Sequence, residues 1–201
     1  MSHSFPRLRW AALVWLTVWA PAYWLVWGPA NFLHLCDIAV ILTCAGLWRG
    51  SSLLLSSQAV SSILADLLWT ADVVGRLVFG KHPIGGTEYM WDGQYPLLVR
   101  LLSLFHVFWP VLLIWSLRRG GYDRRGWRLQ AFLAAVVLAA SRLADPSLNI
   151  NYAHRDPLFH RSWGPAPLHL ALIYSVTVAV FYWPVHRILA RSSLLSRPAV
   201  E

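Results

Sequence analysis

The chain has 201 residues, of which 57% are hydrophobic and 13% are charged, with 17 Lys and Arg against 9 Asp and Glu. Because a soluble domain of this length usually carries about 25% charged residues, the composition excludes an ordinary soluble domain and indicates an integral membrane protein. The formal net charge of +8 does not indicate a nucleic-acid partner, since the arginines fall in short bursts between apolar runs, as the topological anchors of membrane helices do.

Six apolar segments follow one another along the chain, and a helix needs about 20 residues to cross a bilayer. The third segment is longer than that, which fits a tilted helix or one that extends past the lipid. The first has a basic flank and the sequence APA, which is similar to a signal-peptide cleavage site, but its apolar run continues through YWLVW and favours an uncleaved span. We therefore predict an all-α fold, a single polytopic membrane helix bundle over residues 1–201, with spans at about 8–27, 31–48, 51–79, 95–117, 127–144 and 166–189.

The arginines predict the orientation, because cytoplasmic loops carry an excess of Lys and Arg. With the N-terminus inside, the inner segments hold eleven basic residues, namely Arg7, Arg9, Arg49, Arg118, Arg119, Arg124, Arg125, Arg128, Arg187, Arg191 and Arg197. The outer loops hold three, Lys81, Arg155 and Arg161, and the spans hold the remaining three, Arg76, Arg100 and Arg142. Both termini are therefore predicted to be cytoplasmic, with two long loops, 80–94 and 145–165, outside.

The second span begins with NFLHLCDIAV, which places His34, Cys36 and Asp37 in an otherwise apolar segment. His34 and Asp37 share one face of the helix, while Cys36 points about 100° away from Asp37. The second cysteine, Cys44, lies about 12 Å further along the helix, too far for a disulfide with Cys36, which needs Cα atoms within about 7 Å. This cluster fits either a functional site or polar contacts between helices.

The third span carries a polar stripe. Its members are spaced 4, 4, 3, 3 and 4 residues apart and share one face about 120° wide; they are Gln58, Ser62, Asp66, Trp69, Asp72 and Arg76. Asp72 and Arg76 have the spacing of a helical ion pair. A purely structural role for that pair, and for Arg142 with Asp145 at the end of the fifth span, is an alternative.

The ionisable residues of the six spans gather between the bilayer midplane and the outer surface. A charge in mid-bilayer costs at least roughly 2.5 kcal/mol, so we expect these side chains to face the interior of the bundle. We predict one outward-opening polar cavity lined by His34, Asp37, Asp72, Arg76, Arg100, His106, Arg142 and His169.

The first functional hypothesis is an enzyme that modifies a membrane lipid at the outer leaflet. A thiol becomes a good nucleophile when a base or a positive field favours its thiolate, so Cys36 is the candidate nucleophile, His106 or His169 its base, and Asp37 an orienting group. Arginine binds phosphate bidentately, and the candidates for holding a lipid headgroup are His34, Asp72, Arg76, Arg100, Arg142 and His169. The alternatives are a non-enzymatic small transporter or binding protein, and an accessory subunit.

The outer loops contain further histidines and carboxylates that could bind a metal, but their spacings match no dense ligand motif. These residues are His82, His154, His160, Glu88, Asp92 and Asp156. The sequence therefore predicts no metal site, and it identifies neither a cofactor nor a protein partner.

The stretch LHLCDIAVILT, Leu33 to Thr43, resembles the YwaF-like family of bacterial integral membrane proteins, which has a similar H-x-C-x motif at the start of an early helix. Related eukaryotic membrane proteins are phospholipid acyltransferases with a cysteine or threonine nucleophile and a histidine on a later helix. The resemblance implies a multi-pass protein of the bacterial inner membrane, with Cys36 as nucleophile and His106 as base. It covers these eleven residues and the multi-helix layout.

Overall fold

A computed structural model of the chain describes residues 5–195, and within that range the fold is all-helical, without a β-strand. This confirms the predicted all-α class. The helices are α1 (Leu8–Trp27), α2 (Leu35–Arg49), α3 (Ser52–Phe79), α4 (Leu97–Leu102), α5 (Phe105–Gly120), α6 (Gly126–Ser141), α7 (Ala166–Val176) and α8 (Trp183–Arg191). Short 3₁₀ turns occur at Pro29–Leu33, Glu88–Met90, Ile150–Tyr152 and Ser193–Leu195, and a π-helical segment, η4 (Thr177–Tyr182), joins α7 to α8.

Three helical stretches are long and apolar enough to cross a membrane: Leu8–Trp27, Leu97–Gly120 and Ala166–Arg191. The helix Gly126–Ser141 is apolar but shorter. The remaining two predicted spans are not among these stretches. Helix α2 has only 15 residues, and α3, with 28 residues, carries several serines and charged side chains. Membrane character is therefore supported by three stretches, and the six-span count stays a prediction.

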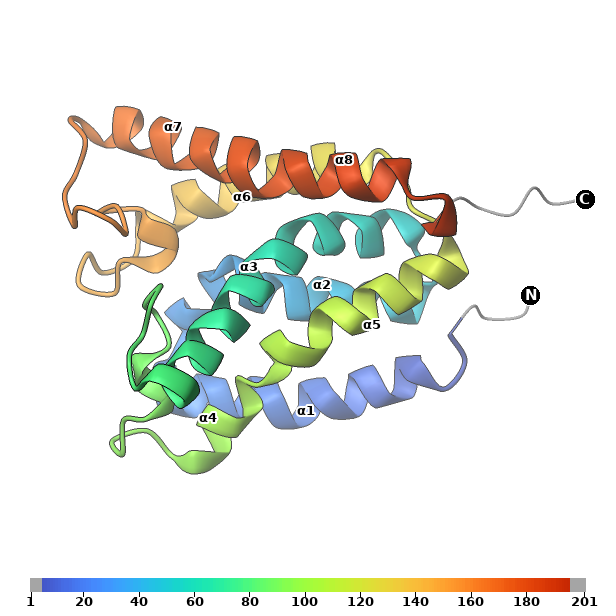
Figure 1. The fold of residues 1–201 in the computed structure, drawn as a ribbon, viewed down its shortest axis with the longest axis horizontal. Coiled ribbons are helices and arrows are strands. Elements are labelled where there is room, and N and C mark those ends of the chain that lie inside the picture. The colour runs from blue at the N-terminus through green and yellow to red at the C-terminus, as the bar shows by residue number, and fades with distance from the viewer. Residues whose placement is uncertain (1–4, 196–201) are drawn as a thin grey trace, which may run out of the picture.

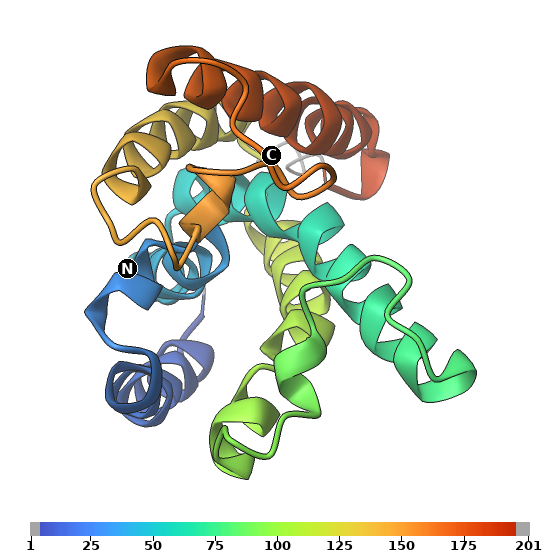
Figure 2. The same ribbon diagram turned by 90° about the vertical axis from the view of Figure 1, so that its left-hand side faces the viewer.

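The helical segments run side by side along the long axis of the molecule, and the chain reverses direction at two ends (Figure 1). One end, named here the terminal end, holds residues 5–9, 49–51, 118–128 and 186–195. There the N–H of Tyr122 donates to the carbonyl of Leu195 at 3.0 Å. The other, the loop end, holds the long loops 80–96 and 145–165, which face the viewer in Figure 2. Arg197 of the predicted inner group lies outside the described residues.

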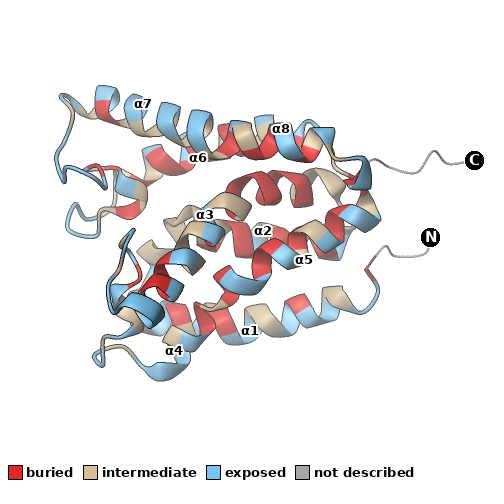
Figure 3. Cartoon of the chain, viewed as in Figure 1, coloured by how far each residue is buried: buried red, intermediate tan, exposed pale blue. Residues whose placement is uncertain are grey.

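Helix α3 is the central element, since it contacts α2, α5, α6 and α8. All residues from Leu55 to Ser62 are buried, on every face of the helix, because neighbours surround this half. Its loop-end half diverges and exposes Leu77 (69%) and Phe79 (75%). Figure 3 shows the same contrast, with buried residues gathered on the inner helices and exposed ones along α7. The exposed apolar faces are those a lipid bilayer would cover.

Two irregularities interrupt the long helical stretches. Residues Ser103 and Leu104 break the helix between α4 and α5, which places His106 at the start of α5. The π segment directly precedes Pro184 on α8. Proline lacks the N–H that would bond to the carbonyl four residues earlier, and a wider turn accommodates that loss.

Candidate functional site

The most pronounced polar contact inside the bundle joins Asp66 on α3 to His106 on α5. Nδ1 of His106 lies 2.7 Å from Oδ1 of Asp66, and the two residues are only 8% and 1% exposed. The imidazole stacks between Trp69, at 4.7 Å between ring centroids, and Phe105, at 4.0 Å. A carboxylate on one ring nitrogen sets the tautomer and orientation of a histidine. The contact is therefore an oriented acid–base pair in a dry environment.

The second oxygen of Asp66, Oδ2, is buried and has no hydrogen-bond partner within the described residues. Leaving a buried polar atom unpaired costs about 1–3 kcal/mol, and more for a charged group. This free-energy cost falls when the carboxyl group takes up a proton, or when water or a bound ligand donates a hydrogen bond to Oδ2. Asp66 is thus a position where binding of a proton or of a small polar group is favourable.

The start of α2 forms a second polar group next to this pair. His34 precedes the helix in an extended conformation, and Asp37 in the first turn is buried. Nδ2 of Asn31 donates to Oδ2 of Asp37 at 2.6 Å, and Sγ of Cys36 lies 3.9 Å from Oδ1 of Asp37. A carboxylate in the first turn also interacts favourably with the helix dipole.

These two groups form one polar region, named here the acid–histidine cluster and defined as His34, Cys36, Asp37, Asp66 and His106. His34 lies within electrostatic range of His106, and Cys36 lies within range of Asp66 as well as Asp37. The structure therefore brings the predicted nucleophile and base into one neighbourhood. They are not hydrogen-bonded to each other, because the thiol faces Asp37 and the imidazole faces Asp66.

Tyr89, from the loop 80–96, lies next to this cluster. Its hydroxyl interacts with the side chains of Ser103 and Trp69 and lies within electrostatic range of Cys36 and Asp37. Burial raises the pKa of Tyr89 to about 12, so the phenol stays protonated and remains a hydrogen-bond donor. A loop residue thus adds a neutral donor near the cluster.

Asp72, predicted to bind substrate, anchors the first outer loop. Its Oδ1 accepts from the backbone N–H groups of Ile84 at 2.7 Å and Gly85 at 2.8 Å. Its Oδ2 accepts from the hydroxyl of Thr87 and lies 3.0 Å from Nδ1 of His82. Because the carboxylate is fully buried under these groups, it organises residues 82–87 into a compact turn.

Two of the predicted headgroup arginines also contact this loop. Nη1 of Arg76 donates to the carbonyl of Gly80, and its guanidinium lies 5.9 Å from the ring centroid of Trp91. Nη1 of Arg100 donates to the carbonyl of Met90 at 3.1 Å, while its Nε is buried without a partner in the described chain. Both arginines therefore bind backbone where α3 and α4 meet the loop.

Arg142 and His169 hold the second outer loop in the same way. Nη1 of Arg142 donates to Nδ1 of His154 at 2.6 Å. Nε2 of His169 donates to the carbonyl of Tyr152 at 2.9 Å, and its Nδ1 accepts from the N–H of Trp163 at 3.3 Å. Burial and the neighbouring Arg142 guanidinium lower the pKa of His154, which fits its role as an acceptor.

The second outer loop has its own buried carboxylate, Asp156. It accepts from the backbone N–H groups of Phe159 at 2.6 Å and Leu158 at 2.9 Å, and from Nε1 of Trp163 at 3.1 Å. Burial raises the pKa of Asp156, but hydrogen bonds from Phe159, Arg161 and Leu158 outweigh it, and the pKa lies below its usual value. Each long loop is thus built around one ionised aspartate.

Neither ion pair considered from the sequence forms within residues 5–195, since salt bridges there involve other partners: His82–Asp72, His106–Asp66 and Arg125–Asp123. Of the predicted headgroup residues, only His34 belongs to the acid–histidine cluster. The others contact loop groups instead of one another: Asp72, Arg76, Arg100, Arg142 and His169. Two adjoining hollows of the described surface lie at the terminal end, not among these residues.

The terminal half contains a second polar interior, made of neutral groups. Oε1 of Gln130 on α6 accepts from Ser57 at 3.1 Å and from Gln58 at 3.4 Å. Its Nε2 donates to Ser61 at 2.9 Å and to the hydroxyl of Tyr182 at 3.2 Å. We name these five residues the amide network. It joins α3, α6 and η4 without a charged side chain.

Sequence reasoning placed Asp66 on the stripe of α3 but gave it no role. A mid-span aspartate one turn from Trp69 was the available signal, and its partner His106 lies 40 residues away in the chain. Among the described residues, no three His, Cys, Asp or Glu side chains lie together as a metal site would require. Of the loop histidines, His82 and His154 make the loop contacts described above.

Comparisons of the chain with protein-family models, curated proteins and solved structures found no match. They therefore leave the resemblance of Leu33–Thr43 to the YwaF-like family as a prediction.

Proposed function

We propose that the chain is a six-span integral membrane protein of a bacterial inner membrane, with cytoplasmic termini, in which the acid–histidine cluster takes up and releases protons. This makes it a small proton-coupled transporter or proton-relay protein. The observation that carries the proposal is the buried contact of 2.7 Å between Asp66 and His106, with one carboxylate oxygen left unpaired among residues 5–195.

The topology is supported by length and charge. Helix α3 spans about 42 Å at 1.5 Å per residue, enough to cross a hydrocarbon core of about 30 Å at a tilt. Helix α2 is shorter, but the 3₁₀ turn Pro29–Leu33 extends it toward the loop end. The terminal end carries most of the arginines, as a cytoplasmic face does. Both described chain ends lie at that end of the bundle (Figure 1), as the proposed six crossings require.

Proton transfer is supported by the chemistry of the cluster. Ionisable residues inside a membrane span are expensive and mark proton relays or ion pathways. Asp66 and His106 can exchange one proton across their contact, so the pair changes between neutral and zwitterionic forms without changing its net charge. A second proton then enters or leaves at the other nitrogen or oxygen. His34 and Asp37 lie nearby as the next groups toward the loop end.

The proposal is tested on the purified full chain in lipid vesicles. Infrared difference spectra between neutral and acidic buffer should contain a protonated-carboxyl band that disappears in Asp66→Asn. The band should persist in Asp145→Asn, which removes an exposed loop carboxylate. Internal pH-dye measurements should show slower proton entry for Asp66→Asn and for His106→Phe than for the unmodified chain. An unchanged carboxyl band in Asp66→Asn would remove the basis of the proposal.

Acyl transfer to a membrane lipid is a second candidate, favoured by one observation: Cys36 lies in the same cluster as His106. In that reaction His106 would remove the thiol proton, Cys36 would attack the carbonyl of an acyl ester or thioester, and the donor's alcohol or thiol would leave with the proton held by His106. A hydroxyl group of the lipid acceptor would then attack the Cys36 thioester and release the thiol. The thiol would first have to turn from Asp37 toward the imidazole. Mass spectrometry should then detect an acyl adduct lost in Cys36→Ala and kept in Cys44→Ala; equal results for the two variants would exclude this reaction.

A further inference from the structure

The terminal end is strongly positive. Its described residues include ten arginines, Arg7, Arg9, Arg49, Arg118, Arg119, Arg124, Arg125, Arg128, Arg187 and Arg191, against a single acidic side chain in the same part of the described chain, Asp123. Most of this charge would attract any anionic surface within about 10 Å. One group of arginines differs from the rest because it surrounds a hollow.

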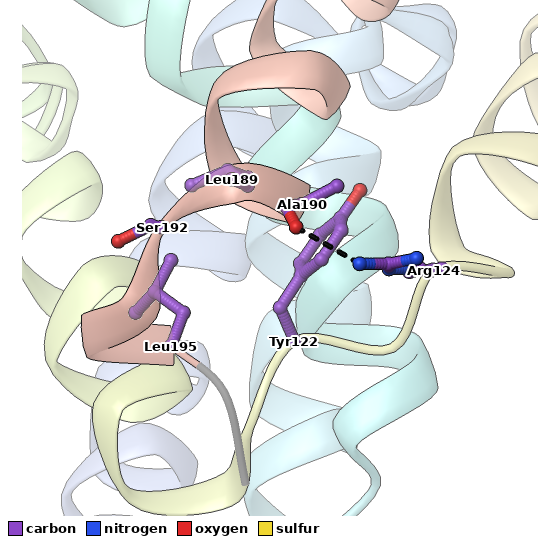
Figure 4. Close-up of a pocket in the computed structure, with 6 residues that line it drawn as sticks. All are labelled: Tyr122, Arg124, Leu189, Ala190, Ser192 and Leu195. Carbon is purple, nitrogen blue, oxygen red and sulfur yellow. Dashed lines mark hydrogen bonds between the residues drawn. The ribbon is translucent and has the colours of Figure 1, made fainter.

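The hollow has a volume of about 290 Å³ and is lined by Arg124, Arg125, Trp127, Arg128 and His186. Asp123 neutralises Arg125 through a contact of 2.8 Å. Arg124 donates to the carbonyl of Ala190 at 3.2 Å, and also lines the adjoining hollow shown in Figure 4. The guanidinium of Arg128 makes no hydrogen bond to another described side chain or carbonyl. Cationic donors therefore remain available to a ligand.

The inner wall of the hollow contains His186, which is buried and whose Nδ1 lies 2.8 Å from the hydroxyl of Tyr122. The charged groups within electrostatic range of this ring are all arginines: Arg124, Arg187 and Arg128. Its other neighbours are the rings of Trp127 at 5.5 Å and Trp183 at 5.4 Å. Positive groups converge here with no carboxylate facing the ring.

Apolar surface continues from this hollow along the membrane-facing side. Trp183 and Ile188 on α8 are 41% and 69% exposed. In the helical stretch Ala166–Arg191, only 17% of the 18-residue apolar segment is buried. A ligand that unites a phosphate with acyl chains would satisfy both surfaces, whereas a free phosphate would use only the arginines. Basic pockets beside membrane helices on the cytoplasmic side are suited to anionic headgroups.

We propose that this hollow binds the phosphate group of an anionic phospholipid from the cytoplasmic leaflet. Arg124 and Arg128 contact the phosphate, Trp127 and Trp183 lie at the interface, and the acyl chains follow the exposed face of α8. The proposal depends on the membrane orientation given above but not on proton transfer by the acid–histidine cluster. Failure of one therefore leaves the other standing.

The experiment measures binding of phosphatidylglycerol to the full chain in neutral detergent micelles, by native mass spectrometry and by thermal unfolding. Phosphatidylcholine and inorganic phosphate are the comparison ligands. Removing two arginines that contact the phosphate should weaken phosphatidylglycerol binding roughly tenfold or more, at about 1 kcal/mol per arginine. The variant is Arg124→Gln with Arg128→Gln, and Arg118→Gln with Arg119→Gln is a charge-matched control at the same end.

Arg124→Lys with Arg128→Lys keeps the charge and tests the site if the glutamine variant unfolds; it should retain part of the binding. The expected pattern is a loss confined to the Arg124 and Arg128 variants, with little binding of phosphatidylcholine. Equal losses in the control would show a general surface-charge effect and overturn the site. Inorganic phosphate that binds as tightly as phosphatidylglycerol would overturn the lipid as ligand.

Discussion

The two polar interiors of the bundle satisfy their hydrogen bonds in different ways. In the amide network, Gln130 uses both of its amide atoms on neighbours from α3 and η4, and Oε1 of Gln58 is the one atom left unpaired there within residues 5–195. In the acid–histidine cluster, the residues are titratable and Asp66 keeps an unpaired oxygen. Neutral networks hold membrane helices together, whereas ionisable ones in a span mark function. Under the proposed function, the amide network serves stability and the acid–histidine cluster serves proton transfer.

The largest effect on stability is expected at the loop anchor, which lies outside both interiors. Asp72→Ala leaves the N–H groups of Ile84 and Gly85 without their acceptor and should lower the free energy of unfolding by about 3 kcal/mol. Thermal unfolding in detergent and hydrogen exchange at residues 82–87 measure it. Asp92→Ala, which loses one bond to Gln94 in the same loop, should have a much smaller effect. Similar losses in the two variants would contradict the assigned anchor.

In the terminal half, Gly126→Ala tests how closely α6 approaches α3. An added Cβ would lie 2.7 Å from Cβ of Ser56 and 2.8 Å from the backbone nitrogen of Ser57, so the helices must separate. Overpacking of this kind costs about 1–3 kcal/mol, visible as a lower unfolding temperature. Gly93→Ala has open space within 4 Å and should be nearly neutral. A neutral Gly126→Ala would mean that the contact is loose.

A pair of substitutions compares the two interiors directly. Gln130→Leu leaves the hydroxyls of Ser61 and Tyr182 without their partner and should destabilise by about 1–2 kcal/mol, with proton uptake unchanged. Asp66→Asn keeps an oxygen that can accept a hydrogen bond from His106, so it should lower the free energy of unfolding by less than Gln130→Leu does, while proton uptake is lost. The reverse pattern would reassign the two roles.

The smallest effect concerns pH at the second outer loop. The pKa of His154 is lowered in the folded chain by burial and by Arg142, so its contribution to stability is present above the unfolded pKa of about 6.5 and declines as pH falls below that value. Asp156, whose folded pKa is also lowered, contributes above about 3.9 and fails at lower pH. The protection factors of residues 149–161 against hydrogen exchange should therefore fall in mild acid, and His154→Gln should remove the first step.

The helices were largely predictable because each apolar run is long and bounded by charged or glycine residues. The predicted spans 8–27, 51–79 and 166–189 correspond to the helices Leu8–Trp27, Ser52–Phe79 and Ala166–Arg191 within three residues. The break at Ser103 and Leu104 and the π segment were not predicted. Both depend on contacts between helices and on Pro184, which periodicity alone does not describe.

The candidate site was predictable only in part. The sequence grouped His34, Asp37 and His106 among the eight residues of one predicted cavity, and the structure brings these three into the acid–histidine cluster. The arginines were harder to place, because a helical spacing of four suggested that Arg76 pairs with Asp72. In the structure the outer loops fold back and supply closer partners: backbone carbonyls for Arg76 and Arg100, and backbone amides for Asp72. The spacing of residues along one helix does not predict which backbone groups of a fifteen-residue loop will contact its side chains.

The π segment Thr177–Tyr182 has a consequence for insertions and deletions in this chain. A π turn holds one residue more than an α turn, so deleting a single residue here would restore a regular α-helix and leave the faces of α7 and α8 in register. His169 would keep its contact with Tyr152, and Tyr182 its contact with Gln130. A single deletion in the regular part of α7 would instead turn the residues before it by about 100°, so the π segment is the place between these two contacts where the chain can lose one residue.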